Sequence, residues 1–283
     1  ALQMGGMNAA RVVGPVLAGF IIAVAGVKWV YIFAVAMYAL ALASMTRVSK
    51  SPPVPGMGNR PVLTELWAGM RYVAGDPPVR ALMILSIVPI LLAMPFQALL
   101  VVFAEDVWDR GSTGLGLLQG AAGVGGIAGS FWVALRGDSP NKLRMLMSSL
   151  LAFSGTLFLF AISPWFLLAL PLVLIADVFA SIFTTVNNTA IQILIPDEVR
   201  GRVMSLMMMT FGLTPLGTVP VAAMAESYGA PVAVAIAAVV TAALSLIILF
   251  MSGALRSIDR VSRDALAAEA SAAQSPRPAT LPG

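Results

Sequence analysis

One stretch of this sequence limits the possible folds more than any other. From residue 145 to residue 196 the chain runs for 52 residues with a single charged side chain, Asp177. As one α-helix it would be about 78 Å long, whereas the hydrocarbon core of a bilayer is about 30 Å thick. The dipeptide Ser163-Pro164 supplies a reversal, so we predict two membrane-spanning helices here, one before it and one from about Trp165 to Ile195.

The composition also indicates a membrane protein. Hydrophobic residues make up 59% of the chain and charged residues 11%, with a mean hydropathy of +0.92, whereas a soluble domain has about 25% charged residues. There are no cysteines and no histidines, which removes disulfides, thiol nucleophiles and the commonest metal ligands. We therefore expect no metal, no cofactor and no enzyme activity. The net charge of +4 comes from basic residues that form no patch, so we expect no nucleic-acid partner.

The other uncharged windows predict six further spans, which makes this chain an all-α polytopic membrane protein with eight transmembrane helices. The windows are 12–27, 29–46, 81–104, 111–135, 203–225 and 229–252. The predicted domains are two transmembrane helices in residues 1–46, a cytoplasmic linker with an amphipathic helix in 47–78, a six-helix bundle in 79–253, and a cytoplasmic, partly disordered tail in 254–283.

The linker combines an irregular segment with a helix. Its sequence SPPVPGMGN is rich in the residues that interrupt helices. After it, apolar residues recur at the i, i+3, i+4 and i+7 positions, which are Leu63, Leu66, Trp67 and Met70. Charged residues lie on the opposite face. This periodicity predicts an amphipathic helix on the membrane surface.

The basic residues indicate how the spans are oriented. If the first residues are cytoplasmic and eight spans alternate, all but two of the 17 Lys and Arg residues fall on the cytoplasmic side, the exceptions being Lys28 and Arg110. The outer loop 105–110 holds three acids. The positive-inside rule describes this asymmetry, which places both termini of the chain in the cytoplasm.

Small and kinking residues concentrate on particular spans. Gly116 and Gly120, then Gly125 and Gly129, have the four-residue spacing that lets two helices approach closely. Prolines interrupt two of the predicted spans, at Pro89, Pro95, Pro215 and Pro220. Two interpretations are open. These residues either give static packing and kinks, which are common in transmembrane helices, or belong to bundles that rock against one another.

Asp177 is the first candidate functional residue. It lies about a dozen residues into its span, near the middle of the bilayer, where an acid costs several kcal/mol unless it is paired or faces water. One interpretation is a cavity carboxylate that carries a proton or recognises a cation. The other is a structural acid that is hydrogen-bonded to a neighbouring helix.

Polar uncharged residues in the spans allow a similar choice. They are Gln97 and Gln119 in other spans, and Thr184, Asn187, Asn188 and Gln192 after Asp177 in the same span. Counted from Thr184, the last four have i, i+3, i+4 and i+8 spacing. Amides both donate and accept hydrogen bonds, so one interpretation is that they line a substrate and proton pathway and bind drug-like molecules loosely. The alternative is hydrogen bonding between helices.

A charged reversal, PDEVRGRV, follows this span. Asp197 is a candidate cap for the next helix, Glu198 is favourable near its positive end, and Gly201 is expected to allow close packing. We predict that Arg200 and Arg202 form a cytoplasmic gate by pairing with acids on a neighbouring helix. The alternative is that these arginines only fix the orientation of the span.

Two longer motifs resemble a known family. The stretch NAARVVGPVLAG at Asn8–Gly19 and the stretch NNTAIQILIPDEVRGRVMSLMMMTFGLTPLG at Asn187–Gly217 look like the major facilitator superfamily. The branch they resemble is that of bacterial exporters similar to the enterobactin exporter and the macrolide-efflux proteins. Arg11, in the first turn of the first span, is either an orientation anchor or, as the resemblance implies, part of the cytoplasmic gate. The resemblance also places Gly14, Pro15 and Gly19 in the exporter motif GPxxAG, as packing or kinking residues.

This resemblance carries expectations about fold and function. The family has twelve spans in two six-helix halves, so the chain would hold spans five and six and the complete second half. The first four spans would be absent, and the missing N-terminal half would be a partner. The implied function is proton-coupled efflux of hydrophobic or drug-like small molecules by alternating access, across the lipid bilayer of the bacterial inner membrane. The alternatives are a siderophore exporter or an importer of the same fold, a membrane-embedded enzyme, and a non-transporting scaffold.

Overall fold

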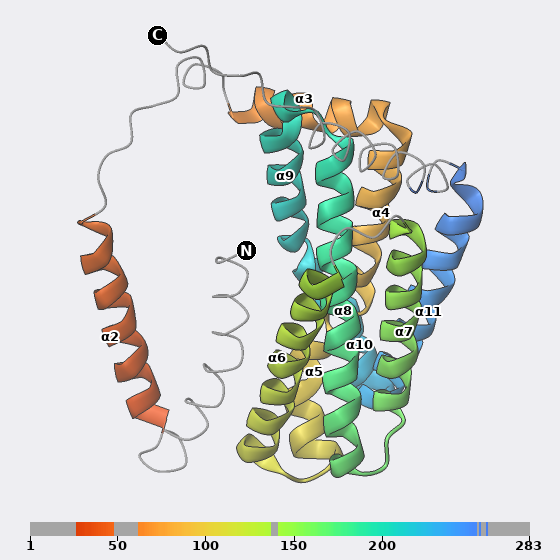
Figure 1. The fold of residues 1–283 in the computed structure, drawn as a ribbon. Coiled ribbons are helices and arrows are strands. Elements are labelled where there is room, and N and C mark those ends of the chain that lie inside the picture. The colour runs from red at the N-terminus through yellow and green to blue at the C-terminus, as the bar shows by residue number, and fades with distance from the viewer. Residues whose placement is uncertain (1–26, 48–61, 137–140, 254, 256–258, 260–283) are drawn as a thin grey trace.

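The computed structural model describes residues 27–47, 62–136, 141–253, 255 and 259, and every element within these ranges is helical (Figure 1). The helices are α2 (Val27–Met45), α3 (Val62–Gly75), α4 (Pro77–Leu92), α5 (Phe96–Val102), the π-helical turn η1 (Phe103–Val107), α6 (Gly111–Arg136), α7 (Lys142–Ala161), α8 (Phe166–Leu194), α9 (Asp197–Phe211), α10 (Thr214–Tyr228) and α11 (Ala230–Met251). The prediction of an all-α membrane protein is confirmed. Among the described residues, 7 helical stretches are long and apolar enough to cross a membrane. Residues 12–26 of the predicted span 12–27 lie outside the described ranges.

The six spans from α4 to α11 run alternately in opposite directions and form one bundle, with α4, α5 and η1 continuing one another in one span and α9 and α10 in another (Figure 1). Within it, α8 packs against both α6 and α7, while α11 packs against α7, α10 and α4. The short helix α3 lies across one end of the bundle, against α9 and α4. Helix α2 stands apart from the bundle in Figure 1, with nearly all of its side chains exposed.

The span predicted at 81–104 is interrupted as its prolines suggest. Pro89 has no backbone N–H, and its carbonyl accepts hydrogen bonds from the N–H groups of both Ala93 (3.0 Å) and Met94 (2.7 Å). Helix α4 ends just before these residues, and Pro95 directly precedes α5. A proline cannot continue the hydrogen-bond ladder of the preceding turn, which explains the break.

The span predicted at 203–225 is divided in a similar way. Helix α9 ends at Phe211, and α10 begins at Thr214 with Pro215 in its first turn. Gly217 follows two residues after Pro215. A Cβ added there would lie 2.0 Å from the carbonyl oxygen of Leu91 on α4. The two interrupted spans therefore touch close to their breaks.

Aromatic side chains fill the core toward the end of the bundle opposite α3. The ring centroid of Phe103 lies 4.9 Å from that of Phe160 and 5.3 Å from that of Trp108. The guanidinium of Arg110 lies over the ring of Phe166, 5.7 Å from its centroid. Because lipid tails are as apolar as these side chains, close van der Waals packing is what holds membrane helices together.

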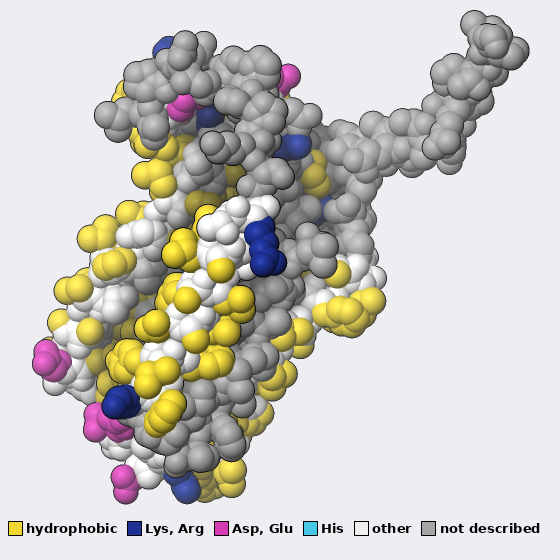
Figure 2. All heavy atoms as spheres, turned by 90° about the vertical axis from the view of Figure 1, so that its left-hand side faces the viewer, with side chains coloured by type: hydrophobic (Ala, Val, Ile, Leu, Met, Phe, Trp, Pro, Cys, Tyr) yellow, Lys and Arg dark blue, Asp and Glu magenta, His cyan; other side chains and the backbone are white. Residues whose placement is uncertain are grey.

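The outer surface is apolar along the sides and charged at the ends. Figure 2 views the molecule from the side of α2 and shows hydrophobic side chains over most of the described surface between the ends. The end that carries α3 holds Arg71, Arg80, Arg136, Arg144, Arg200 and Arg202 together with the acids Glu65, Asp76 and Glu198, and the other end holds Glu105, Asp106, Asp109, Arg110 and Glu226. Assigning the basic end to the cytoplasm follows from the positive-inside rule and stays a prediction.

Candidate functional site

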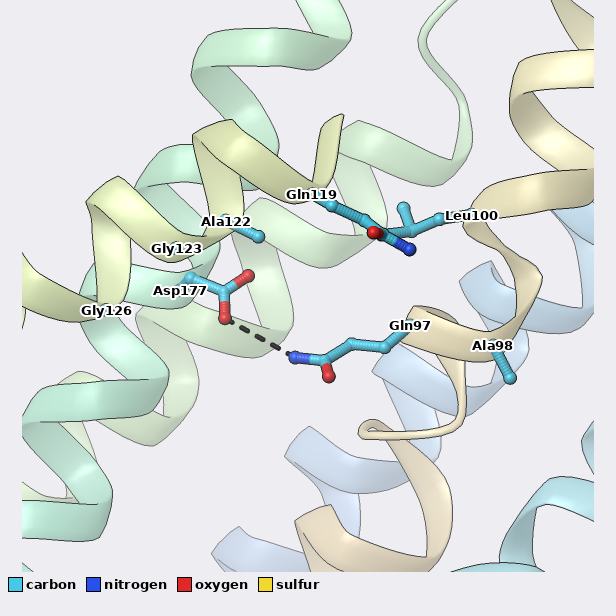
Figure 3. Close-up of a pocket in the computed structure, with 8 residues that line it drawn as sticks. All are labelled: Gln97, Ala98, Leu100, Gln119, Ala122, Gly123, Gly126 and Asp177. Carbon is cyan, nitrogen blue, oxygen red and sulfur yellow. Dashed lines mark hydrogen bonds between the residues drawn. The ribbon is translucent and has the colours of Figure 1, made fainter. Parts of the chain in front are cut away.

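Asp177 lies in the middle of α8 and lines a cavity of about 390 Å³ between α5, α6 and α8. Its side chain is 7% exposed. The cavity is lined by Gln97, Ala98, Leu100, Gln119, Ala122, Gly123, Gly126 and Asp177 (Figure 3). The structure therefore brings together three residues that the sequence marked separately: the acid and the two glutamines.

Glycines on α6 decide how closely this helix approaches the acid. A Cβ added at Gly125 would lie 2.2 Å from the carbonyl oxygen of Leu174 and 3.1 Å from the Cβ of Asp177. A Cβ at Gly129 would lie 2.3 Å from the carbonyl oxygen of Val178. The backbones of α6 and α8 are thus in contact, and the small residues on this part of α6 leave the cavity open beside the carboxylate.

Gln97 reaches the acid from the first turn of α5. Its Nε2 donates a long hydrogen bond of 3.5 Å to Oδ1 of Asp177 (Figure 3). Since α5 begins directly after Pro95, the break in the span predicted at 81–104 fixes where this amide lies. An amide donor and a carboxylate acceptor in one cavity can bind both polar groups and protons.

A pair of serines that we did not single out from the sequence joins α6 to α8 about one turn further along. Ser181 Oγ donates to the carbonyl oxygen of Gly126 at 2.8 Å, and the hydroxyls of Ser130 and Ser181 lie 2.7 Å apart. Because Ser181 follows Asp177 by four residues, it lies on the same helical face. That spacing was the available signal, and the serine hydrogen bonds hold the cavity wall in place.

The other predicted polar residues on α8 lie elsewhere. Thr184, Asn187 and Asn188 line a second, smaller cavity of about 40 Å³ that is bordered by α4 and α9. The physical reason is distance along the helix, since these residues follow Asp177 by seven to eleven positions and lie about 10 to 17 Å further along the axis. Gln192 is exposed and lines neither cavity.

At the basic end, Arg202 on α9 forms an ion pair with Glu65 on α3, through Nε and Oε2. Both side chains are 32% exposed. A Cβ at Gly69 would lie 3.0 Å from the Leu206 side chain, so α3 sits close against α9. We expected Gly201 to allow such an approach, but a Cβ there meets no described atom within 4 Å. Among the described residues, the glycine in close contact at this end is Gly69 on α3.

The remaining predicted residues of this end have simpler positions. Pro196 occupies the capping position of α9, so Asp197 is the first helical residue rather than the cap. Glu198 and Arg200 are exposed. Arg11, Gly14, Pro15 and Gly19 lie outside the described residues.

Helix α3 turns its polar side toward α9 and leaves part of its apolar side exposed. Trp67 and Met70 are exposed, at 67% and 45%, while Glu65 and Gly69 face α9. Burial and the neighbouring Asp76 carboxylate raise the pKa of the Tyr72 phenol, which therefore stays neutral at physiological pH. The exposed tryptophan suits the interface between lipid and water.

The ion pair between α3 and α9 gives a testable prediction. We expect Glu65→Gln and Arg202→Gln each to lower the thermal-unfolding midpoint in detergent by about 2 to 4 °C. The double variant should lose no more than either single variant, because both substitutions remove the same interaction. Glu105→Gln, at the opposite end, is the control. Strictly additive losses would show that the two side chains do not interact.

The described residues contain no group of three or more acids that could hold a metal ion. They form apolar spans, two of them interrupted, around a buried carboxylate that lines a cavity, and these features indicate a polytopic membrane protein. The match between sequence and family is specific. The chain belongs to the transmembrane secretion effector family of the major facilitator superfamily, which matches residues 1–276. The predicted membership of this superfamily is thereby confirmed.

Individual relatives are also exporters by name. The chain is 26% identical over 227 residues to the multidrug efflux pump Tap of Mycolicibacterium fortuitum, which covers 78% of this chain and 55% of that protein. It is 25% identical over 207 residues to the enterobactin exporter EntS of Escherichia coli, which covers 73% of this chain and 49% of EntS. The chain therefore spans about half the length of these curated relatives. No solved structure matches it.

Proposed function

We propose that this protein is a proton-coupled secondary exporter of hydrophobic or drug-like small molecules in the bacterial inner membrane, with both termini cytoplasmic. The observation that carries the proposal is the Asp177 carboxylate, which is buried within a membrane span and lines the 390 Å³ cavity. An acid at this depth is costly, and such acids mark proton and ion pathways. The efflux pump and the exporter among its relatives support the outward direction.

Alternating access needs two helix bundles that rock about a site near the middle of the membrane. The bundle from α4 to α11 provides one of them. The second, in this proposal, is an N-terminal half to which α2 belongs. Helix α2 is apolar along its length and its side chains are exposed, which suits a helix whose packing partners lie in that other half.

The coupling step takes place at Asp177. With a proton bound, the carboxyl group is neutral and its cavity can lose water at lower cost. When the proton leaves, the carboxylate attracts polar or cationic groups of the substrate. The proton and the substrate therefore favour different states of the same cavity, which links their movements in opposite directions.

The contact between α3 and α9 serves as the cytoplasmic gate in this proposal. Arg202 and Glu65 join the linker helix to the interrupted span α9 and α10. Opening the cytoplasmic side separates them and exposes both charges to water. Since both side chains are already one-third exposed, the pair can open and close at small cost.

Asp177→Asn tests the proposed function. We expect proton-driven export of rhodamine 123 from cells that express the polypeptide at its natural length to fall about tenfold or more, because asparagine cannot take up or release a proton. Because rhodamine 123 is a cation, the purified variant should also bind it more weakly, since the carboxylate that attracts cationic groups is gone. Ser148→Ala, an exposed change on α7, is the control. Export by Asp177→Asn at the rate of the unmodified protein would exclude the coupling role.

A siderophore exporter is the second candidate, favoured by the similarity to EntS. Competition separates the two candidates. Enterobactin should suppress dye export at low concentration if siderophores are the natural substrates, and should have little effect on a drug exporter. An enzyme is disfavoured, because the family and the relatives named above are transporters.

A further inference from the structure

The second cavity lies where the two interrupted spans meet α8. Pro89 reaches it from the last turn of α4, Met94 from the break between α4 and α5, and Phe211 from the end of α9. Asn187 projects into the same space from α8. Binding sites in membrane transporters commonly form at such discontinuous helices, because the freed backbone and side-chain groups can line a cavity there.

The orientation of the Asn187 amide follows from its neighbours. Ser86 Oγ donates to the carbonyl oxygen of Leu82 at 2.9 Å, so its hydroxyl proton is already used. Ser86 Oγ therefore accepts from Asn187 Nδ2, at 2.6 Å. The oxygen of the same amide, Oδ1, is buried and has no hydrogen-bond partner among the described residues, and the whole side chain is 2% exposed. A buried oxygen without a hydrogen-bond partner is unfavourable, so a ligand that donates a hydrogen bond to it would be stabilised there.

The other groups around this cavity limit which ligand groups can bind there. Thr184 Oγ1 donates to the carbonyl oxygen of Ala180 at 2.9 Å, and Thr210 Oγ1 donates to that of Met207 at 2.6 Å. Both hydroxyl protons are used within their own helices, so these oxygens can only accept further hydrogen bonds. Most of the remaining lining is apolar and aromatic, and at about 40 Å³ the cavity holds the end of a molecule rather than a whole one.

We propose that the second cavity is a specificity subsite that holds an N–H or O–H end group of the transported molecule, with Asn187 Oδ1 as the acceptor. This inference rests on the proposed export function. Asp177 does not line the second cavity, so proton uptake and recognition of the donor group occur at different places along α8. The substrates preferred by this subsite are apolar molecules that carry an exposed hydrogen-bond donor.

Two dyes with the same xanthene core test this inference. Rhodamine 123 carries N–H groups on its ring system, whereas tetramethylrhodamine methyl ester carries only N-methyl groups there. We expect the purified protein to bind rhodamine 123 about tenfold more tightly, measured by fluorescence anisotropy in detergent, and to export it with a correspondingly higher kcat/KM. Asn187→Leu should abolish this preference by weakening rhodamine 123 alone. Thr189→Val, on the same helix but lining neither cavity, should preserve it.

The outcomes separate this inference from the proposed function. Export of both dyes with equal kcat/KM by the unmodified protein would overturn the subsite and leave the export function intact. Selective binding of rhodamine 123 without proton-driven export would support the subsite and overturn the proposed function. Equal weakening of both dyes by Asn187→Leu would also overturn the subsite, since it makes Asn187 a packing residue. The comparison of dyes on the unmodified protein needs no substitution and is decisive by itself.

Discussion

Gly125→Ala is expected to lower the thermal-unfolding midpoint of the protein by about 5 to 10 °C and to abolish transport. The added Cβ would lie 2.2 Å from the carbonyl oxygen of Leu174 and 3.0 Å from its carbonyl carbon. Backbone atoms cannot move aside as a flexible side chain can, so α6 must shift away from α8 as a unit. The Cβ of Asp177 lies 3.1 Å from the same point, so the shift also displaces the acid from its cavity.

Gly116→Ala is the matched control for this prediction. Gly116 lies on the same helix and belongs to the same four-residue glycine pattern, but a Cβ there meets no described atom within 4 Å. We expect its unfolding midpoint and its transport rate to stay near those of the unmodified protein. Equal effects of the two substitutions would show that the contact between α6 and α8 does not govern the result.

The second large effect is expected for Gly217→Ala. Its Cβ would lie 2.0 Å from the carbonyl oxygen of Leu91 and 2.6 Å from the carbonyl carbon. This contact joins the two interrupted spans, so separating them changes the geometry of both breaks. We expect the unfolding midpoint to fall by about 5 to 10 °C and both dyes to bind more weakly, because the second cavity lies between these spans.

An exposed glycine on α7 provides the comparison for Gly217. Gly155 has no described atom within 4 Å of an added Cβ, and alanine is the better helix former, so Gly155→Ala should be neutral or slightly stabilising. Melting curves and dye titrations on both variants check the prediction. If Gly217→Ala and Gly155→Ala have the same unfolding midpoint, helices α4 and α10 do not pack as closely as the structure places them.

Several features of the fold could be predicted from the sequence because they depend on local properties. A long uncharged window crosses a membrane as a helix, since backbone groups must be satisfied internally in lipid. The reversal at Ser163-Pro164 and the interruptions at Pro89 and Pro215 follow from proline geometry. Asp177 was identifiable for a similar reason, because it is the one charged residue in 52.

The site itself depends on contacts between distant helices. The sequence marked Gln97, Gln119 and Asn187 as polar, but nothing in it assigned the glutamines to the acid and the asparagine to Ser86. Likewise, the glycine pattern included both Gly116 and Gly125, and only one of them touches α8. Gly201 was a plausible packing glycine, yet Gly69 on α3 makes the contact with α9.

The sequence by itself determined that this chain crosses a membrane repeatedly, where most of its helices begin and end, and which acid lies buried. Hydropathy and charge act through the transfer of each segment from water to lipid, and proline acts through the backbone of its own segment. Their effects can therefore be predicted segment by segment from the sequence. Only the tertiary structure decided that the polar residues of α8 belong to two cavities and that α3 is joined to α9. Those outcomes depend on how each helix is rotated and which neighbour it meets. Close backbone contacts at the glycines and at the interrupted helices fix both.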